Sequence, residues 1–317
     1  MSSMKDVAKH AEVSSATVSR YINDSGYVSD KNKKKIQKSI DELQYVPNEL
    51  ARSFYRNSSK MIGIIVPNIN NPFFTEMASY VGQCLFAKGY KSIFCNVEDN
   101  SSIEQEYIDM LRQYKVDGFI IISSTNGQSY KNIDIPIVAF DRSLGGNTVT
   151  VTCDNYKGGE EAGKYLLSSG CKNILEIKGP SNILNMVERS RGFRHVLNEE
   201  NLKYKELEVS LDIDEAILLI KSILTTEKID GIFVPIDILA TAVVKLSNQL
   251  NIKIPQQLKI IGFDGIKLGD MIQPTFSTIK QPINEMGNLA VELMMDMINK
   301  KEIKEKKYTL PIELIKR

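Results

Sequence analysis

Two short helices separated by a tight polar turn are predicted by the stretch K-D-V-A-K-H-A-E-V-S-S-A-T-V-S-R-Y-I-N, residues Lys5 to Asn23. Val7, Ala8 and Ala11 recur at the spacing of one helix face, which predicts a first helix from about Met4 to Ala11. An apolar stripe of this width indicates a helix that packs on one side only. The stretch is therefore typical of a small helical module.

The second helix follows the turn Glu12-Val13-Ser14, whose serine can cap a helix start. We expect it from about Ser15 to Ile22, with Ile22 and either Ala16 or Val18 facing inward. The side chains that this arrangement leaves polar are Ser15, Thr17, Ser19 and Arg20. Asn23-Asp24-Ser25-Gly26 then breaks the helix.

A third helix is predicted from Ser29, a second capping residue, to about Gln44. Ile36, Ile40 and Leu43 share one of its faces, opposite a run of lysines. Two short helices around a tight turn, backed by a third, form helix-turn-helix geometry. The second helix would fit a DNA major groove about 12 Å wide, with Ser15, Ala16 and Arg20 directed at base edges.

The net charge of the chain hides an uneven distribution. The 317 residues carry 40 Lys and Arg against 39 Asp and Glu, a formal charge of +1. Residues 1–60 hold eleven basic and seven acidic side chains, which gives +4, and the remainder is left with −3. A basic segment on an acidic body indicates a module that binds a polyanion. The competing interpretation is that the lysines of 31–38 are only the solvated face of a helix.

Several classes of protein are excluded by composition. No window approaches the roughly 20 apolar residues that span a bilayer, and the N-terminus lacks the apolar core of a secretory signal. The four cysteines are scattered without a C-x-x-C pair, which fits free thiols in a cytoplasmic protein. With two histidines, a His-rich metal site is not expected. We therefore predict a cytoplasmic protein with no metal and no cofactor.

A short switchable helix is predicted after the third one. Pro47 blocks continuation, and Asn48 can cap a new helix through Glu49 to Tyr55, which includes Ala51, Arg52 and Phe54. A segment shorter than about 12 residues is marginally helical by itself. Its helicity would therefore depend on DNA or on a dimer partner.

The sequence pattern changes from Met61 onward to apolar runs alternating with helical patterns. The runs are 61–66, 93–94, 118–122, 137–140, 174–177, 231–234 and 260–263, and the helical patterns are 74–88, 103–114, 160–167, 191–199, 237–249 and 283–299. Buried parallel strands that alternate with helices give a doubly wound α/β architecture. The number of units predicts two lobes, with a ligand at the carboxyl ends of the strands.

The residues that follow these strands form a plausible sugar-binding set. They are Asn71, Phe73, Phe74, Asp141, Arg142 and Asp264, together with Arg189 at a helix and Gln281 on a crossover. Aromatic rings stack on C–H surfaces, and charged groups and amides bond hydroxyls. Each has an alternative interpretation, since Phe73 and Phe74 could be core residues and Asp141-Arg142 a surface ion pair.

No catalytic set is found. Residues 158–164, G-G-E-E-A-G-K, fit the start of a phosphate loop, but Tyr165 stands where the Mg²⁺-binding hydroxyl is required, and no strand leads directly into the segment. We interpret it as part of a helix. His10 and His195 cannot be assembled with a nucleophile and a carboxylate into a triad. The chain is therefore not expected to be an enzyme.

The N-terminal motifs resemble the DNA-binding headpiece of the LacI family, through Lys5 to Asn23 and through Y-V-P-N-E-L-A-R-S-F, Tyr45 to Phe54. The resemblance implies an all-α helix-turn-helix headpiece whose second helix reads the major groove, followed by a hinge helix in the minor groove. It implies base-reading roles for Ser15, Ala16 and Arg20, and phosphate or capping roles for Thr17, Ser19 and Asn23. Phe54 stands where the family places a leucine wedge, and an aromatic wedge can also open a base step.

The remainder resembles the α/β two-lobed type I periplasmic-binding-protein-like core. The resemblance implies a headpiece at 1–47, a hinge helix and linker at 48–60, and an effector-binding and dimerisation domain at 61–317. Lobe one would comprise about 61–155 and 282–300, and lobe two about 156–277 with the C-terminal strand.

Four motifs, N-N-P-F-F, F-D-R, G-F-D-G and T-I-K-Q-P, are similar to those of ribose operon repressors. They imply a ribose-type pocket made of Asn71, Phe73, Phe74, Asp141, Arg142, Arg189, Asp264 and Gln281. One position departs from the pattern, because Ile236 replaces the asparagine that precedes an aspartate in that family. A related pentose, a deoxygenated sugar or another small polyol is therefore the alternative to ribose.

The expected function is that of a homodimeric transcription repressor. Two headpieces would bind a pseudo-palindromic operator in double-stranded DNA, and a small sugar effector would release it. The alternatives are a catabolite-control regulator that answers to a protein co-effector, and a sugar-binding module without a regulatory role. No membrane partner is expected.

Overall fold

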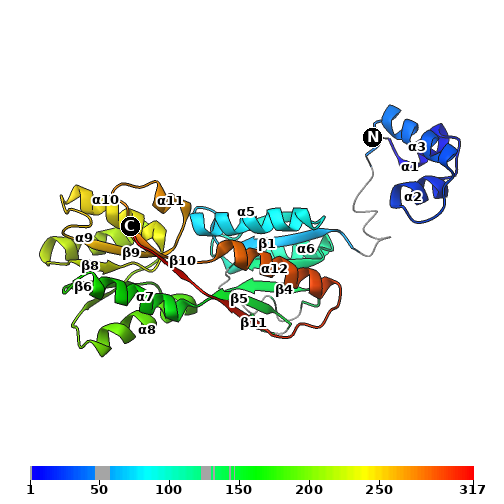
Figure 1. Cartoon of the computed structure of the whole chain (residues 1–317). Coiled ribbons are helices and arrows are strands. Elements are labelled where there is room, and N and C mark those ends of the chain that lie inside the picture. Colours follow the sequence, from blue (N-terminus) through cyan, green and yellow to red (C-terminus); the bar gives the residue numbers. More distant parts are fainter. Residues whose placement is uncertain (1, 47–57, 123–129, 131–132, 143, 146) are drawn as a thin grey trace. The chain divides into compact units, whose positions relative to one another are not determined.

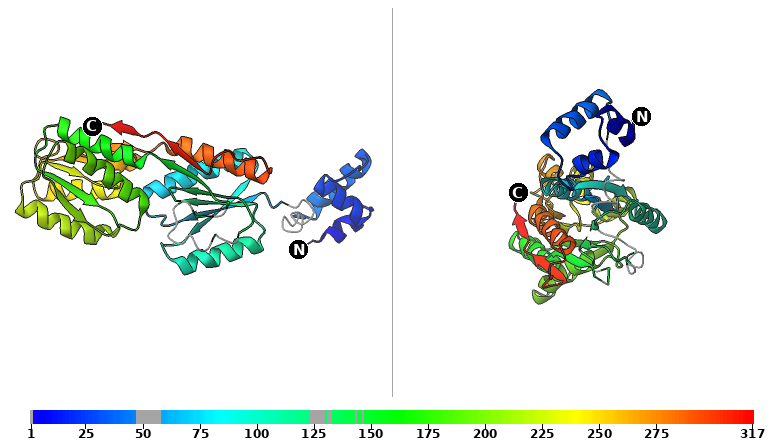
Figure 2. Two further views of the ribbon diagram at one scale, coloured as in Figure 1. Left: turned by 90° about the horizontal axis from the view of Figure 1, so that it is seen from below. Right: turned by 90° about the vertical axis from the view of Figure 1, so that its right-hand side faces the viewer.

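The structure is a computed structural model that describes residues 2–46, 58–122, 130, 133–142, 144–145 and 147–317. Figures 1 and 2 show the arrangement of its helices and strands. None of the helices in these residues has the length and the apolar character needed to span a bilayer.

Residues 2–46 fold into the expected helix-turn-helix arrangement, with α1 (Met4–His10), α2 (Ser15–Asn23) and α3 (Asp30–Glu42) (Figure 1). The apolar side chains at its centre are Val7, Ala8, Ala11, Val18, Val28 and Ile36. The spacing of apolar residues in the sequence predicted these helices, and the buried side chains pack the helices against one another. This unit is called the headpiece below.

The start of α2 is fixed by Ser14, whose Oγ accepts a hydrogen bond from the backbone N–H of Thr17 at 3.1 Å. Val18 is fully buried and Ala16 is exposed, so Val18 is the residue of α2 that faces the core. Ser29 precedes α3 as expected, but its side chain makes no capping hydrogen bond. The helix therefore begins without the cap that the sequence predicted.

The first sheet of the core has the strand order β11-β5-β4-β3-β1-β2, and its registered pairs are parallel. The strands are β1 (Met61–Val66), β2 (Lys91–Asn96), β3 (Gly118–Ile122), β4 (Ile137–Phe140), β5 (Val149–Cys153) and β11 (Lys307–Leu310). The helices of this lobe are α5 (Pro72–Ala87), α6 (Ser101–Gln113) and α12 (Ile283–Ile298), and α5 packs beside α12. This sheet and its helices are called lobe one.

The second sheet has the order β12-β10-β9-β8-β6-β7. The strands are β6 (Ile174–Lys178), β7 (Lys205–Glu208), β8 (Gly231–Phe233), β9 (Lys259–Asp264), β10 (Ser277–Lys280) and β12 (Glu313–Ile315), the last antiparallel to β10. The helices are α7 (Asn155–Ser168), α8 (Leu184–Glu199), α9 (Ile213–Thr226), α10 (Asp237–Gln249) and α11 (Lys267–Asp270). This sheet and its helices are called lobe two.

The chain passes between the lobes after β5, after β10 and after β11 (Figure 2). The C-terminal segment therefore contributes one strand to each sheet. Because these connections join parallel sheets at one end, they place the carboxyl ends of the strands of both lobes around a common cleft. The doubly wound α/β architecture with two lobes, predicted from alternating strands and helices, is confirmed.

Helices α7 and α8 approach each other unusually closely, and glycines make the approach possible. A Cβ atom on Gly159 would lie 2.0 Å from the carbonyl oxygen of Arg189, and one on Gly192 would lie 1.9 Å from that of Tyr156. The segment 158–164 therefore lies inside a helix, as interpreted, and its glycines serve packing. No strand leads directly into the segment, because β5 ends at Cys153 and α7 begins at Asn155.

Candidate functional site

A cavity of about 230 Å³ lies between the two lobes, at the carboxyl ends of their strands. Lobe one lines it with Pro67, Asn68, Asn70, Asn71, Phe73, Phe74, Asp99, Asp141 and Arg142. Lobe two lines it with Asn182, Ile183, Leu184, Asn185, Met186, Arg189, Leu211, Ile213, Ile236, Ile238 and Asp264. Polar and charged groups thus converge there from both sheets, in the position where open α/β folds bind ligands.

Arg189 is the best-fixed side chain of the cavity, with only 2% of its surface exposed. Its Nε donates to Asn155 Oδ1 at 2.8 Å, and its Nη1 donates to the carbonyl oxygen of Pro235 at 2.7 Å. The same Nη1 lies 3.5 Å from Asp264 Oδ1, and the guanidinium carbon lies 3.7 Å from the centre of the Phe263 ring. Three polar contacts and one aromatic ring therefore fix the guanidinium in position before a ligand binds.

Asp264 is buried at the end of β9 and has a positive φ of 126°, a conformation that side-chain-bearing residues rarely adopt. Its Oδ1 accepts a hydrogen bond from Gln281 Nε2 at 2.8 Å. Burial raises the pKa of Asp264, and the adjacent Arg189 guanidinium opposes that shift. The carboxylate is therefore held rigidly at the strand end with part of its hydrogen-bonding capacity already used.

Asp141 occupies the corresponding position in lobe one, after β4, and has a φ of 63°. Thr152 Oγ1 donates to its Oδ1 at 2.9 Å, and Asn185 Nδ2 donates to its Oδ2 at 3.3 Å. Burial raises the pKa of Asp141, while the charge of Arg189 acts in the opposite direction. Since Asn185 begins α8 of lobe two, its hydrogen bond to Asp141 crosses the cleft.

Two phenylalanines give lobe one its apolar contact surface. Phe73 and Phe74 begin α5, and their ring centres lie 5.6 Å apart at 66°. Asn71 caps this helix, because its side chain accepts a hydrogen bond from the backbone N–H of Phe73 at 3.1 Å. The motif N-N-P-F-F thus combines a helix cap with an aromatic edge of the cavity.

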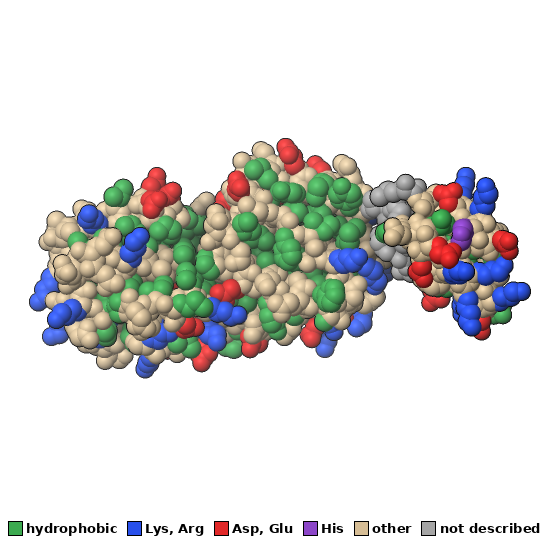
Figure 3. Space-filling model, turned by 90° about the horizontal axis from the view of Figure 1, so that it is seen from above, with side chains coloured by type: hydrophobic (Ala, Val, Ile, Leu, Met, Phe, Trp, Pro, Cys, Tyr) green, Lys and Arg blue, Asp and Glu red, His purple; other side chains and the backbone are tan. Residues whose placement is uncertain are grey.

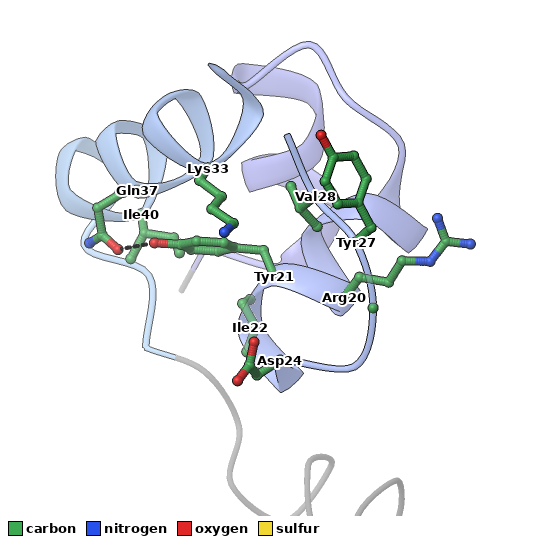
Figure 4. Close-up of a pocket in the computed structure, with 10 residues that line it drawn as sticks. Arg20, Tyr21, Ile22, Asp24, Tyr27, Val28, Lys33, Gln37 and Ile40 are labelled. Carbon is green, nitrogen blue, oxygen red and sulfur yellow. Dashed lines mark hydrogen bonds between the residues drawn. The ribbon is translucent and has the colours of Figure 1, made fainter. Parts of the chain in front are cut away.

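A second hollow, of about 520 Å³, lies on the headpiece between the end of α2, the following turn and α3 (Figure 4). Tyr21 donates its hydroxyl hydrogen to Gln37 Oε1 at 2.7 Å, which ties α2 to α3. Figure 4 shows the Arg20 side chain directed outward on the same side as Tyr27, and Tyr27 is 88% exposed. The headpiece therefore presents a cation and an aromatic ring beside α2.

Basic side chains gather on the surface of the headpiece (Figure 3). Lys31, Lys34 and Lys38 on α3 are exposed, and Lys35 reaches Glu12 at 3.0 Å. Exposed pairs of this kind are screened by salt and leave the positive field of the helix largely intact. The charge distribution fits contact with a polyanion.

Family models match nearly the whole chain. The model described as periplasmic binding proteins and sugar binding domain of LacI family matches residues 59–317, and the model of bacterial regulatory proteins of the lacI family matches residues 3–48. The chain belongs to the LacI family.

Two operon repressors and one solved regulator structure are similar to this chain. The ribose operon repressor of Halalkalibacterium halodurans is 37% identical over 319 residues, which cover 100% of this chain and 96% of the relative. The sucrose operon repressor of Streptococcus mutans is 40% identical over 314 residues, covering 98% and 97%. The crystal structure of a LacI transcriptional regulator from Alkaliphilus metalliredigens, complexed with D-xylulofuranose, is 35% identical with a TM-score of 0.76 and covers 81% of this chain and 98% of that one.

Most pocket residues named from the sequence line the same cavity between the lobes. They are Asn71, Phe73, Phe74, Asp141, Arg142, Arg189, Ile236 and Asp264. Gln281 lies outside the lining, is 1% exposed and acts behind Asp264, whose carboxylate it holds. Ile236 belongs to the lining, so the position that departs from the ribose-repressor pattern faces the site itself.

Other pocket residues were missed from the sequence. Asn185 and Asn155 bond Asp141 and Arg189, and Leu184, Met186, Leu211, Ile213 and Ile238 extend the lobe-two wall. One signal could have found Asn185, because it precedes Arg189 by one helical turn and so shares its face. Asn155 could have been found had β5 been recognised, since it begins the helix that follows that strand.

The DNA-binding residues named from the sequence occupy different environments. Ser15, Ala16 and Arg20 are exposed on α2, and Thr17 and Ser19 are half-buried. Asn23 is 8% exposed and donates to Ser19 Oγ at 3.2 Å. Asn48, Ala51, Arg52 and Phe54 lie outside the described residues. Within the described part of the chain, no group of His, Cys, Asp and Glu is arranged to hold a metal ion.

Proposed function

We propose that this protein is a repressor of a sugar-utilisation operon that is released from its operator by a small sugar. Residues 1–47 would bind DNA, 48–60 would form the hinge and linker, and 61–317 would bind the effector and a second subunit. Lobe one of that domain would be 61–155 with 282–300, and lobe two 156–277 with the C-terminal strand. The observation that carries the proposal is the cavity in which fixed carboxylates and a guanidinium converge from two lobes, in a chain that also bears a helix-turn-helix headpiece.

The chemistry of the cavity supports a neutral polyol as the effector. Asp141, Asp264 and Arg189 offer bonds to hydroxyl groups, while Phe73 and Phe74 offer apolar faces to C–H surfaces. A volume of about 230 Å³ lies below the roughly 300–1,000 Å³ of most ligand pockets, which favours a monosaccharide. Ribose or a related pentose is the favoured effector, in agreement with the relatives named for ribose and bound to D-xylulofuranose.

The exposed face of α2 supports direct reading of DNA sequence. Ser15, Ala16 and Arg20 would contact base edges in the major groove, with Thr17, Ser19 and Asn23 contributing phosphate contacts or caps. Asn48, Ala51, Arg52 and Phe54 would form the minor-groove hinge, with Phe54 as the wedge. Two headpieces of one dimer would recognise a pseudo-palindromic site.

An exposed apolar surface on lobe one supports a homodimer. Phe86 on α5 is 77% exposed and Phe94 on β2 is 51% exposed, and the Phe94 ring lies over Gly82, where a Cβ would approach it to 3.1 Å. Hydrophobic side chains gather on the exposed surface of lobe one (Figure 3). A second copy of the chain would cover this surface. Phe86→Asp should therefore give monomers in sedimentation, while Thr225→Asp, the same charge at an exposed site on α9, should leave the dimer intact.

The effector would act by stabilising one arrangement of the lobes. A sugar bonded to Asp141 in lobe one and to Arg189 and Asp264 in lobe two favours the closed cleft. Closure moves the lobe to which residues 48–60 connect, which changes the spacing of the paired headpieces. By linkage, operator and sugar would each weaken the binding of the other.

The proposal is tested by selecting binding sites from random double-stranded DNA with the purified protein and then adding sugars to the complex. A symmetric site should be enriched, and a pentose should lower affinity for it. Enrichment of no sequence would refute a sequence-specific repressor. An enriched site whose occupancy no sugar changes would refute sugar control while leaving DNA recognition in place.

A further inference from the structure

Part of the lobe-two wall of the cavity is apolar. Met186, Ile213, Ile236 and Ile238 line the cavity and also belong to the hydrophobic cluster of lobe two, so they form a continuous surface. At the outer part of the same lining, Leu184 is 59% exposed and Leu211 is 40% exposed. An apolar surface of this extent favours an apolar group on whatever occupies the cavity.

The side chains of Pro235, Ile236 and Asp237 offer an effector no free hydrogen-bonding group. Pro235 has no N–H, and its carbonyl oxygen accepts from Arg189 Nη1 at 2.7 Å. Asp237 is fully buried and accepts bonds from Gly265 N at 2.7 Å, Ile266 N at 3.1 Å and Thr278 Oγ1 at 2.7 Å. Ile236 lines the cavity, and its side chain is a hydrocarbon without a donor or an acceptor. A hydroxyl packed against the Ile236 side chain would lose its bonds to water and gain none from that side chain.

We propose that the effector is a monosaccharide in which an apolar substituent replaces one hydroxyl, as in a deoxy sugar, and that this substituent contacts Ile236. The inference rests on the proposed function and names its ligand class. The hydroxyl groups of the sugar bond Asp141, Arg189 and Asp264, and the substituent packs on the isoleucines of lobe two. Burial of a methyl group in place of an unsatisfied hydroxyl should favour the deoxy sugar by roughly tenfold or more.

The test is calorimetric titration of the full-length protein with matched pairs of sugars. The pairs are D-ribose and 5-deoxy-D-ribose, L-galactose and L-fucose, and L-mannose and L-rhamnose, which differ by one hydroxyl. For at least one pair, the deoxy member should bind roughly tenfold more tightly than its parent, and it should also release DNA from the selected site.

Ile236→Asn tests the contact directly. Residue 236 is the N-cap of α10 and its isoleucine makes no capping bond, so asparagine is compatible with the helix start. The preference for the deoxy sugar should fall or reverse in Ile236→Asn and persist in Ile236→Val. Leu211→Ser, a change at an exposed lining position, should weaken the preference, while Leu218→Ser, on the same lobe but outside the lining, should not.

The outcomes separate this inference from the proposed function. If parent sugars bind more tightly in every pair and still release DNA, the apolar-substituent inference is wrong and the repressor proposal stands. If Ile236→Asn binds as well as wild type with an unchanged preference, the contact with Ile236 is wrong. If no sugar binds at all, the inference and the sugar-responsive function both fail, although sequence-specific DNA binding can still be measured.

Discussion

Asn185 of lobe two donates a hydrogen bond to Asp141 of lobe one, across 3.3 Å. The two residues are 44 positions apart in the chain, and both line the cavity. A second bond also joins the lobes, from the backbone N–H of Lys267 to Glu76 Oε1 at 3.0 Å. These two bonds link the lobes directly, and a ligand that adds further links between them can shift the opening of the cleft.

Asn185→Ala should weaken effector binding by about 1 kcal/mol, because it removes one link across the cleft and leaves Asp141 with one bond fewer. Titration calorimetry with the effector measures this change. Asn198→Ala, at an exposed position of the same helix outside the cavity lining, is the matched control and should bind normally. Equal affinities for the two variants would contradict a role for the Asn185–Asp141 bond.

Gly159→Ala should destabilise the protein by about 3 kcal/mol or more, because its Cβ would overlap the Arg189 carbonyl oxygen at 2.0 Å. Urea unfolding measures the loss. Gly163→Ala on the same helix meets Val196 at 3.2 Å and should cost much less. A Gly159→Ala protein as stable as wild type would show that α7 and α8 do not need this close approach.

Glu176 predicts a pH dependence of stability. The residue is fully buried on β6, and burial raises its pKa to about 7, against a hydrogen bond from Ser190. The carboxyl of Glu176 ionises less readily in the folded state than in the unfolded state. Its contribution to the free energy of unfolding is therefore fully present below the pKa of the unfolded state and is lost as pH rises through about 7. Glu176→Gln should be more stable than wild type at pH 8 by roughly 2–3 kcal/mol, with little difference at pH 5. The same difference in unfolding free energy between Glu176→Gln and wild type at pH 5 and at pH 8 would contradict this prediction.

Arg20→Ala should remove roughly 1–3 kcal/mol of discrimination between the selected site and random DNA. Lys31→Ala changes an exposed cation on α3 instead, and should lower the affinity for both DNAs and reduce the salt slope by about one. Fluorescence anisotropy over a range of salt concentrations distinguishes the two effects. Undiminished discrimination in Arg20→Ala would remove this side chain from base reading.

The sequence predicted the elements whose apolar spacing is long and regular. The headpiece helices followed from Val7, Val18 and Ile36, and the central strands β1, β3 and β9 from continuous apolar runs. The pocket lining followed in part from one geometric rule, because Asp141 and Asp264 stand directly after parallel strands. The local sequence pattern was sufficient to predict the position of a residue wherever that position depends only on the strand or helix that contains it.

Elements without a long apolar run were missed. The V-T-V-T-C of β5 is fully buried, but its threonines interrupt the run, and β7 and β11 are edge strands with exposed alternate residues. The partners of Arg189 were also missed, since Asn155 reaches it through the contact of α7 with α8. Such contacts depend on tertiary packing, which spacing along one element does not encode.

In the proposed mechanism, a sugar bound between the lobes lowers the affinity of the headpieces for their operator. The most direct measurement is the anisotropy of a labelled, selected operator titrated with wild type and with Asp264→Asn, each with and without a saturating effector. Asn at this position keeps a partner for Gln281 but removes the carboxylate from the cavity. We predict at least roughly tenfold weaker operator binding by wild type with the effector, a coupling of about 1.4 kcal/mol, and a much smaller change in Asp264→Asn. Equal operator affinity of wild type with and without bound sugar would contradict it.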